Sequence, residues 1–165
     1  MATGWRASSL TEAEIADGES YHRALYHDGD IERPAGWHRD SVNHLLELAQ
    51  PHIQQGSLVV DYGAGTGGSA IELLKLTDAA GLKIELVLID PLVSWFSKAR
   101  ELLEHRNDVH FVFSMFTNEE GRSDFFRLEE MLDGRKADVI LSSSTLHLVP
   151  TKALPDLGVQ FAESL

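Results

Sequence analysis

Apolar runs and amphipathic stretches alternate along most of this chain. Runs of mostly apolar residues, each of strand length, cover 58–60, 84–89, 109–113 and 137–141. Apolar residues at helical spacing predict helices over 69–76, 92–103, 123–132 and 152–165, the last interrupted by Pro155. Strands that alternate with helices in this way predict βαβ units and a parallel sheet covered on both faces. The expected fold class is therefore α/β, doubly wound.

The residues before the first apolar run have a weaker period. Thr11 and Glu14 form the [ST]-x-x-[DE] pattern of a helix start, so we expect a helix there. Asp28-Gly29-Asp30 would stop that helix. A second helix would begin near Asp40 and end at Pro51.

The charge balance argues against nucleic acid as a partner. The chain has 26 acidic and 14 basic residues, a net charge of −12, and no cluster of Lys and Arg. A phosphate backbone would be repelled, because nucleic-acid binding depends on such clusters. We expect a well-solvated acidic surface.

The lack of cysteine and of long apolar runs excludes further classes. Without cysteine no disulfide, thiolate metal site or cysteine nucleophile can form, which favours a cytoplasmic setting. No H-x-x-x-H spacing occurs among the histidines, so we predict no metal site. No run approaches the length of a membrane span, and the N-terminus is too polar and acidic for a signal peptide.

The connection between the first strand and its helix is rich in glycine. Gly63, Gly65 and Gly67 alternate, and Gly68 follows. Glycine allows positive φ and a close approach of backbone N–H groups and a helix N-terminus to a ligand. Because Gly63, Gly65 and Gly68 also satisfy G-x-G-x-x-G, a nicotinamide cofactor stays open at this point.

Two carboxylates flank this loop. Asp61 stands two residues before Gly63, where it would repel a pyrophosphate but accept hydrogen bonds from an ammonium or a water. Asp90 ends the second apolar run, where a carboxylate can accept both ribose hydroxyls of an adenosine. Together they favour a nucleoside that carries an amine and no phosphate.

The pattern Asp-x-Gly-x-Gly-x-Gly at 61–67 resembles the first motif of class I S-adenosylmethionine (SAM)-dependent methyltransferases. This resemblance covers roughly residue 40 to the end and implies a Rossmann-like sheet that binds SAM and its product S-adenosylhomocysteine (SAH). The cofactor-binding residues that we predict on this basis are Asp61, Gly63, Ala64, Gly65, Gly67, Asp90, Pro91, Met115, Phe116 and Ser142.

The segment after the third strand departs from the family pattern. Members often have an acidic residue there that contacts the adenine amino group, whereas this chain has Ser114-Met115-Phe116-Thr117. Met115 and Phe116 either pack on the adenine face or belong to the core.

The segment after the fourth strand, 141–150, resembles that of small-molecule methyltransferases and lacks the Asp/Asn-Pro-Pro-aromatic signature of nucleic-acid amino methyltransferases. His147 is its catalytic candidate, as a general base on a substrate hydroxyl. A histidine between two leucines is more often structural, and we favour that interpretation. Alignment of the donor with the nucleophile supplies much of the rate in either case.

The resemblance also suggests how the chain is organised. Residues 1–39 would be an N-terminal helical segment or lid, and 40–165 the SAM-binding domain. Tyr21, Tyr26, Trp37 and His38 are candidates for the lid, with packing against the sheet as the alternative. The family sheet continues beyond a fourth strand, so we expect a domain truncated after that strand and its helix. A missing C-terminal segment, a partner or a second copy in a homodimer would cover the exposed edge.

The sequence is therefore compatible with three functions. The leading one is methyl transfer from SAM to a small-molecule acceptor by in-line displacement. The alternatives are a non-catalytic, methyltransferase-like domain that binds SAM as a scaffold, and an NAD(P)-binding Rossmann domain. Asp61 argues against the last, because a dinucleotide fold prefers a small or apolar residue there.

Overall fold

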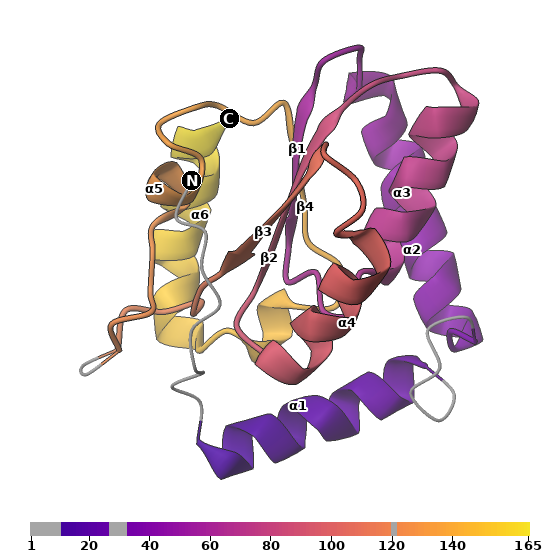
Figure 1. Ribbon diagram of the computed structural model, residues 1–165. Coiled ribbons are helices and arrows are strands. Elements are labelled where there is room, and N and C mark those ends of the chain that lie inside the picture. The colour runs from indigo at the N-terminus through magenta and orange to yellow at the C-terminus, as the bar shows by residue number, and fades with distance from the viewer. Residues whose placement is uncertain (1–10, 27–32, 120–121) are drawn as a thin grey trace.

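A four-stranded, wholly parallel sheet in the order β3-β2-β1-β4 forms the centre of the protein (Figure 1). The computed structural model describes residues 11–26, 33–119 and 122–165. The strands are β1 (Leu58–Tyr62), β2 (Glu85–Asp90), β3 (Val109–Phe113) and β4 (Val139–Leu141). The α-helices are α1 (Glu12–Leu25), α2 (Gly36–Ala49), α3 (Gly68–Ala79), α4 (Val93–Leu103), α5 (Leu128–Met131) and α6 (Leu154–Ser164). Short 3-10 turns are η2 (Gln50–His52), η3 (Leu146–Leu148) and η4 (Thr151–Ala153).

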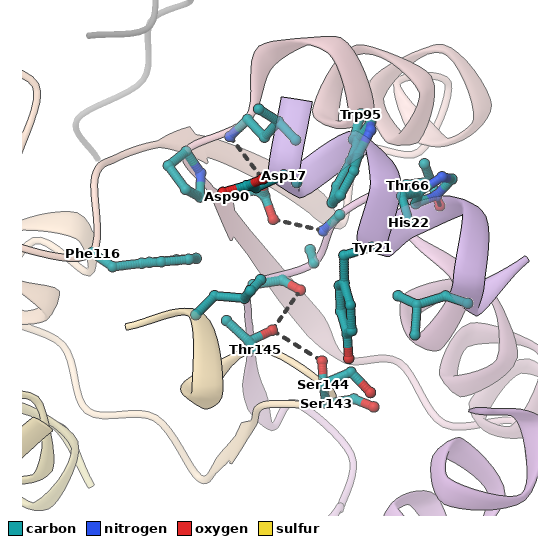
Figure 2. A pocket seen from close by; sticks show the side chains of 18 of the residues that line it. Asp17, Tyr21, His22, Thr66, Asp90, Trp95, Phe116, Ser143, Ser144 and Thr145 are labelled. Atoms are coloured by element: carbon teal, nitrogen blue, oxygen red, sulfur yellow. Dashed lines mark hydrogen bonds between the residues drawn. The ribbon is translucent and has the colours of Figure 1, made fainter. Parts of the chain in front are cut away.

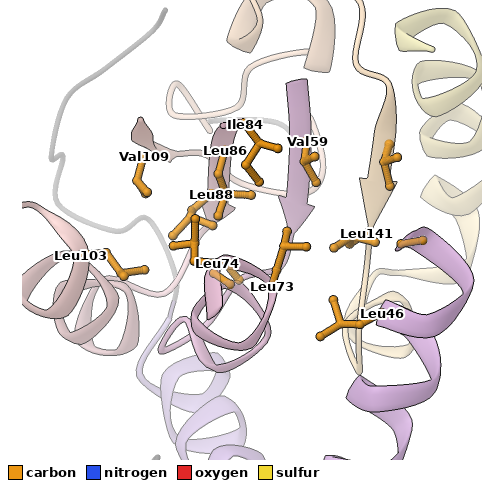
Figure 3. Packing of buried hydrophobic residues seen from close by; sticks show 14 of the residues in the cluster. Leu46, Val59, Leu73, Leu74, Ile84, Leu86, Leu88, Leu103, Val109 and Leu141 are labelled. Carbon is orange, nitrogen blue, oxygen red and sulfur yellow. The ribbon is translucent and has the colours of Figure 1, made fainter. Parts of the chain in front are cut away.

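Helices cover both faces of the sheet, which confirms the doubly wound α/β prediction. Alternate residues of β2 point to opposite faces, so Leu86 and Leu88 join a cluster with α2, α3 and α4 (Figure 3). Val87 and Ile89 join a second cluster under α5 and α6. All four of these side chains are fully buried, which explains the unbroken apolar run.

Helix α1 belongs to neither layer. It runs across the end of the sheet below α4 (Figure 1). Its start at Glu12 confirms the helix predicted from Thr11, and Ile15 N donates to Thr11 O. The side chain of Glu14 and the predicted stop at Asp28-Gly29-Asp30 lie outside the described residues.

The helix predicted over 123–132 is mostly wrong. Only Leu128–Met131 is helical, because the preceding residues pair with the segment after β3. Met115 N donates to Asp124 O at 3.1 Å, and Phe126 N donates to Ser114 Oγ at 3.0 Å. These tertiary hydrogen bonds replace the helical ones that the apolar spacing suggested.

Smaller corrections concern element ends. The second helix begins at Gly36 and not near Asp40, and β1 extends through Asp61 and Tyr62, which pair with β2. Pro155 does not interrupt the last helix but lies in its first turn, where a missing N–H costs no hydrogen bond. Among the described residues, no helix is both long and apolar enough to span a membrane.

The chain leaves β1 through a loop whose three alternating glycines all have positive φ. Gly63, Gly65 and Gly67 have φ of 85°, 54° and 86°. Gly63 N and Ala64 N both donate to Ile89 O, at 2.8 and 3.0 Å, so the loop is anchored on β2. The glycine pattern therefore reflects a real backbone requirement.

A first prediction concerns the core. Leu88→Ala removes a fully buried side chain from the central sheet, so we expect a loss of about 3 kcal/mol in the free energy of unfolding. Leu102→Ala, on the 43% exposed Leu102 of α4, should cost less than about 1 kcal/mol. Urea denaturation of both variants checks the difference; equal losses would contradict the assigned core.

A second prediction separates two loop glycines. A Cβ on Gly63 would lie 2.1 Å from Thr145 Oγ1, whereas one on Gly65 would meet nothing within 4 Å. Gly65→Ala should therefore cost only about 1 kcal/mol, for the positive φ. Gly63→Ala adds a steric clash and should cost at least about 2 kcal/mol more. Urea denaturation again provides the measurement, and a smaller loss for Gly63→Ala would refute the close approach of Thr145.

Candidate functional site

A cavity of about 290 Å³ lies at the carboxyl ends of the four strands, between the loops that follow them and α1 (Figure 2). This is where open α/β sheets bind ligands. Figure 2 shows Tyr21 descending from α1 toward Ser143 and Ser144, which follow β4, while Phe116 lies at the left of the view. The volume of the cavity is close to the lower end of the range for ligand pockets.

Asp90, at the end of β2, lines this cavity and organises its loops. Its Oδ2 accepts a hydrogen bond from Gly65 N and its Oδ1 accepts one from Leu92 N, both at 2.8 Å. Burial raises the pKa of Asp90 to about 7, although the two backbone donors act in the opposite direction. Each oxygen can still accept another donor, so this carboxylate suits a ligand with two hydroxyls.

Asp61 lies behind the loop, buried in β1, and does not line the cavity. Its Oδ2 accepts a hydrogen bond from Ser69 Oγ at 2.9 Å, and Ser69 does line the cavity. Its Oδ1 is buried and has no hydrogen-bond partner in the described part of the chain. Burial raises the pKa of Asp61 to about 6, against the hydrogen bond from Ser69. An unpartnered buried oxygen of this kind indicates that a further donor is needed.

The structure brings most of the predicted cofactor residues together. Those that line the cavity are Gly63, Ala64, Gly65, Asp90, Pro91, Met115 and Phe116. Met115 and Phe116 line the cavity and also belong to the core. Met115 is buried, and the ring centroids of Phe116 and Tyr62 lie 5.1 Å apart.

Three other predicted residues do not line the cavity. Gly67 caps α3, and a Cβ there would meet Ala99 at 3.1 Å, so it sets how α3 approaches α4. Ser142 Oγ donates to Tyr62 O at 3.0 Å, which joins the ends of β4 and β1. His147 is exposed on η3, and its ring packs edge-on against Tyr21 at 4.7 Å.

Of the four lid candidates, Tyr21, Tyr26 and His38 line the cavity, whereas Trp37 is half exposed and does not. The sequence interpretation missed the other cavity residues of α1, among them Gly18, His22 and Leu25. Their signal was the spacing of three and four residues, which places them on one face of a helix. It also missed Trp95 and Thr145, for which the sequence alone carried no evident signal, whereas Thr66 lies within the motif at 61–67.

Carboxylates outnumber cations among the cavity-lining residues. Asp17 and Glu119 join Asp90 there, and Arg122 is the cation. Arg122 lies 3.6 Å from Glu119, so its charge is largely balanced. The cavity therefore offers little positive charge to attract an anionic ligand.

No protein-family model matches the sequence, and no match was found among curated proteins. Several solved structures match the fold. Phosphoethanolamine N-methyltransferase 1 from Haemonchus contortus, solved with phosphoethanolamine and SAH, aligns with a TM-score of 0.57 and 11% identity. That alignment covers 93% of this chain and 29% of the other.

Two further structures agree. The glycopeptide N-methyltransferase MtfA, solved with SAM, aligns with a TM-score of 0.56 and 16% identity, over 76% of this chain and 50% of that one. A SAM-dependent methyltransferase from Geobacter sulfurreducens, solved with SAH, aligns with a TM-score of 0.52 and 16% identity. That alignment covers 94% of this chain and 51% of the other. The chain spans between 29% and 51% of the length of these structures. The protein thus has the α/β fold of class I SAM-dependent methyltransferases, as the motif at 61–67 predicts.

Proposed function

We propose that this protein binds SAM in the cavity below α1 and transfers its methyl group to a small-molecule acceptor. The observation that carries the proposal is the Asp90 carboxylate, which lies in the cavity and is tied to the glycine loop through Gly65 N. The three similar structures were all solved with SAM or SAH, which supports the same ligand class.

The residues of the site fit this cofactor. Asp90 would accept the ribose hydroxyls, because both of its oxygens retain acceptor capacity. The unpartnered Oδ1 of Asp61 matches an ammonium or a water that bridges to one. Gly63, Ala64 and Gly65 present backbone along the amino-acid end, and Met115 and Phe116 supply apolar surface for a flat ring. A dinucleotide fits less well, since its pyrophosphate would lie near the carboxylate of Asp61.

When bound, SAM supplies an electrophilic methyl group on a sulfonium. The chain's own contribution is to orient the two reactants and to exclude water, and alignment alone accounts for a large part of such a rate. Tyr21 of α1 and the residues after β4, Ser143 and Ser144, border the same cavity and would hold the acceptor. We keep His147 as a structural residue that supports Tyr21, because it packs on the Tyr21 ring and does not line the cavity.

The charges of the cavity favour an uncharged or cationic acceptor. Asp17 and Glu119 are the carboxylates beside Asp90, and the only cation among the cavity residues that the structure describes, Arg122, is close to Glu119. An anionic acceptor would gain no free cation here and would be repelled by the carboxylates. Because α1 lines one side of the cavity, the acceptor must also be small enough to fit beside Tyr21.

The first test is calorimetry with SAH. We expect binding at about pH 8 with a Kd in the micromolar range, and at least about tenfold weaker binding by Asp90→Asn, since charge-assisted hydrogen bonds contribute most. The matched control is Asp40→Asn, on an exposed Asp40 of α2, which should bind SAH like the wild type. Binding of NADH in place of SAH would overturn the proposal. Binding of SAH and SAM without turnover over a broad acceptor panel would leave only a SAM-binding domain.

The second test is proton release. Donors from the ribose favour the ionised carboxylate, so they should lower the pKa of Asp90 from about 7 in the free protein. Binding then releases protons near neutral pH, and affinity rises as the pH rises through about 7. Calorimetry near pH 7 in buffers of different ionisation enthalpy measures this release. Asp90→Asn should lose it; an unchanged release would assign it to another group.

A further inference from the structure

Helix α1 is joined to the cofactor loop and to α2 by a buried chain of four polar side chains. His22 Nε2 lies 3.2 Å from Thr66 Oγ1, and His38 Nε2 lies 3.1 Å from Tyr26 Oη. Hydrogen bonding with the Thr66 side chain acts to lower the pKa of Tyr26, so the chain of contacts runs His22–Thr66–Tyr26–His38. We call this chain the relay. None of its members is more than 6% exposed.

The relay connects segments that are far apart along the chain. His22 belongs to α1, Tyr26 directly follows it, Thr66 lies in the glycine loop and His38 belongs to α2. Figure 2 shows His22 beside Thr66 at the edge of the cavity. Tyr26 packs closely on the start of α3, since a Cβ on Gly68 would lie 2.2 Å from Tyr26 Oη.

The number of hydrogens in the relay is limited. Three hydrogen bonds need three hydrogens, and the hydroxyls of Thr66 and Tyr26 supply one each. Burial raises the pKa of Tyr26 to about 12, so its hydroxyl keeps its hydrogen. The third hydrogen must come from one imidazole Nε2–H. The other imidazole must accept at Nε2, so a complete relay has His22 and His38 in opposite neutral tautomers.

Protonation of either histidine spoils this arrangement. A histidinium donates from both ring nitrogens, so the accepting imidazole would turn into a fourth donor for three bonds. One hydroxyl hydrogen would then lack a buried acceptor, and a positive charge would be buried without a carboxylate bonded to it. His38 Nδ1 already lacks a partner among the described residues.

The groups around the relay oppose a positive charge on it. Trp95 of α4 packs on the His22 ring at 4.5 Å, and Lys98 of the same helix adds repulsion. Burial first, then Lys98 and His38, lowers the pKa of His22 to about 4. Burial also lowers the pKa of His38.

Further charged groups lie near the relay, and Asp17 of α1 and Asp90 of β2 line the same cavity as its members. Asp61 of β1 acts on Tyr26. On the far side of His38, Arg39 of α2 and Glu72 and Lys75 of α3 border a second groove, and Glu72 and Lys75 pair with each other at 2.7 Å.

We propose that His22 and His38 are positioning residues of the cofactor loop, which seat α1 over the cavity and hold Thr66 only while both imidazoles are neutral. Cofactor affinity and the docking of α1 are then lost together on acidification. The docking follows from the relay alone, whereas the effect on affinity rests on the proposed SAM binding.

The direction of the pH effect follows from the lowered pKa values. Docking is complete above about pH 6.5, the free value for histidine, and weakens as the pH falls toward about 4 for His22. Each histidine contributes at most about tenfold per pH unit. Asp90 and Asp61 titrate near pH 7 and 6 and also affect ligand binding, so variants of the relay are needed to separate the two sources.

The first experiment needs no ligand. Long-range proton–nitrogen NMR spectra of ¹⁵N-histidine-labelled protein report the tautomer and the titration of each ring. We expect His22 and His38 in opposite tautomers at about pH 8, with both titration midpoints below 6.5 and a shared loss of protection of α1 amides in acid. The same tautomer in both rings, or midpoints near 6.5, would overturn the relay.

The second experiment measures SAH affinity at about pH 8 and pH 5.5. Thr66→Val removes the hydroxyl at nearly constant volume and should weaken binding about tenfold at the higher pH, whereas Thr66→Ser should stay within about threefold. His22→Gln keeps a neutral hydrogen-bonding group and should reduce the loss of affinity on acidification. His44→Gln, on an exposed histidine of α2, is the control and should change neither value.

The outcomes separate the two proposals. If the folded wild type fails to bind SAH at either pH, the proposed function fails, and the NMR experiment still decides the relay. If the wild type binds and Thr66→Val binds as tightly, the positioning role is wrong. Unfolding curves establish that each variant is folded. If Thr66→Val does not fold, the SAH affinity of Thr66→Ser decides the positioning role.

Discussion

The hydrogen bonds that Asp90 accepts at the end of β2 hold together both loops that border the cavity. Gly65 N comes from the loop after β1 and Leu92 N from the loop after β2, and each is 2.8 Å from a carboxylate oxygen. The positive φ of Gly65 turns its N–H toward this carboxylate. A ligand that meets Asp90 therefore meets a site whose backbone is already in place, which lowers the cost of binding.

Burial acts on two carboxylates and two imidazoles of the site in the direction of the uncharged form. It raises the pKa of Asp61 and Asp90 and lowers that of His22 and His38, so their ionised forms are the costly ones. In the proposed SAM complex, the two carboxylates would regain favourable interactions from the donors of the ligand. The two histidines instead form internal hydrogen bonds that need no charge. One part of the site is thus completed by the ligand, and the other by α1.

The apolar runs were sufficient to locate all four strands, because parallel strands buried on both faces leave no polar positions. The segment 123–127 shows where this reasoning fails. Phe126 is one of the apolar residues that predict a helix, yet the backbone of Phe125 and Phe126 pairs with Met115 and Ser114 after β3. Local periodicity does not distinguish a residue buried by its own helix from one buried by a distant segment.

The sequence by itself determined the fold class, the loop at 61–67 and the two carboxylates, because these depend on local patterns of glycine, burial and charge. Only the tertiary structure decided which candidates meet in the cavity. It placed Asp61 behind the loop, left His147 outside, and brought His22 onto Thr66 and His38 onto Tyr26. The physical reason is distance along the chain: His22 and Thr66 are 44 residues apart, and no local pattern encodes a hydrogen bond of that range.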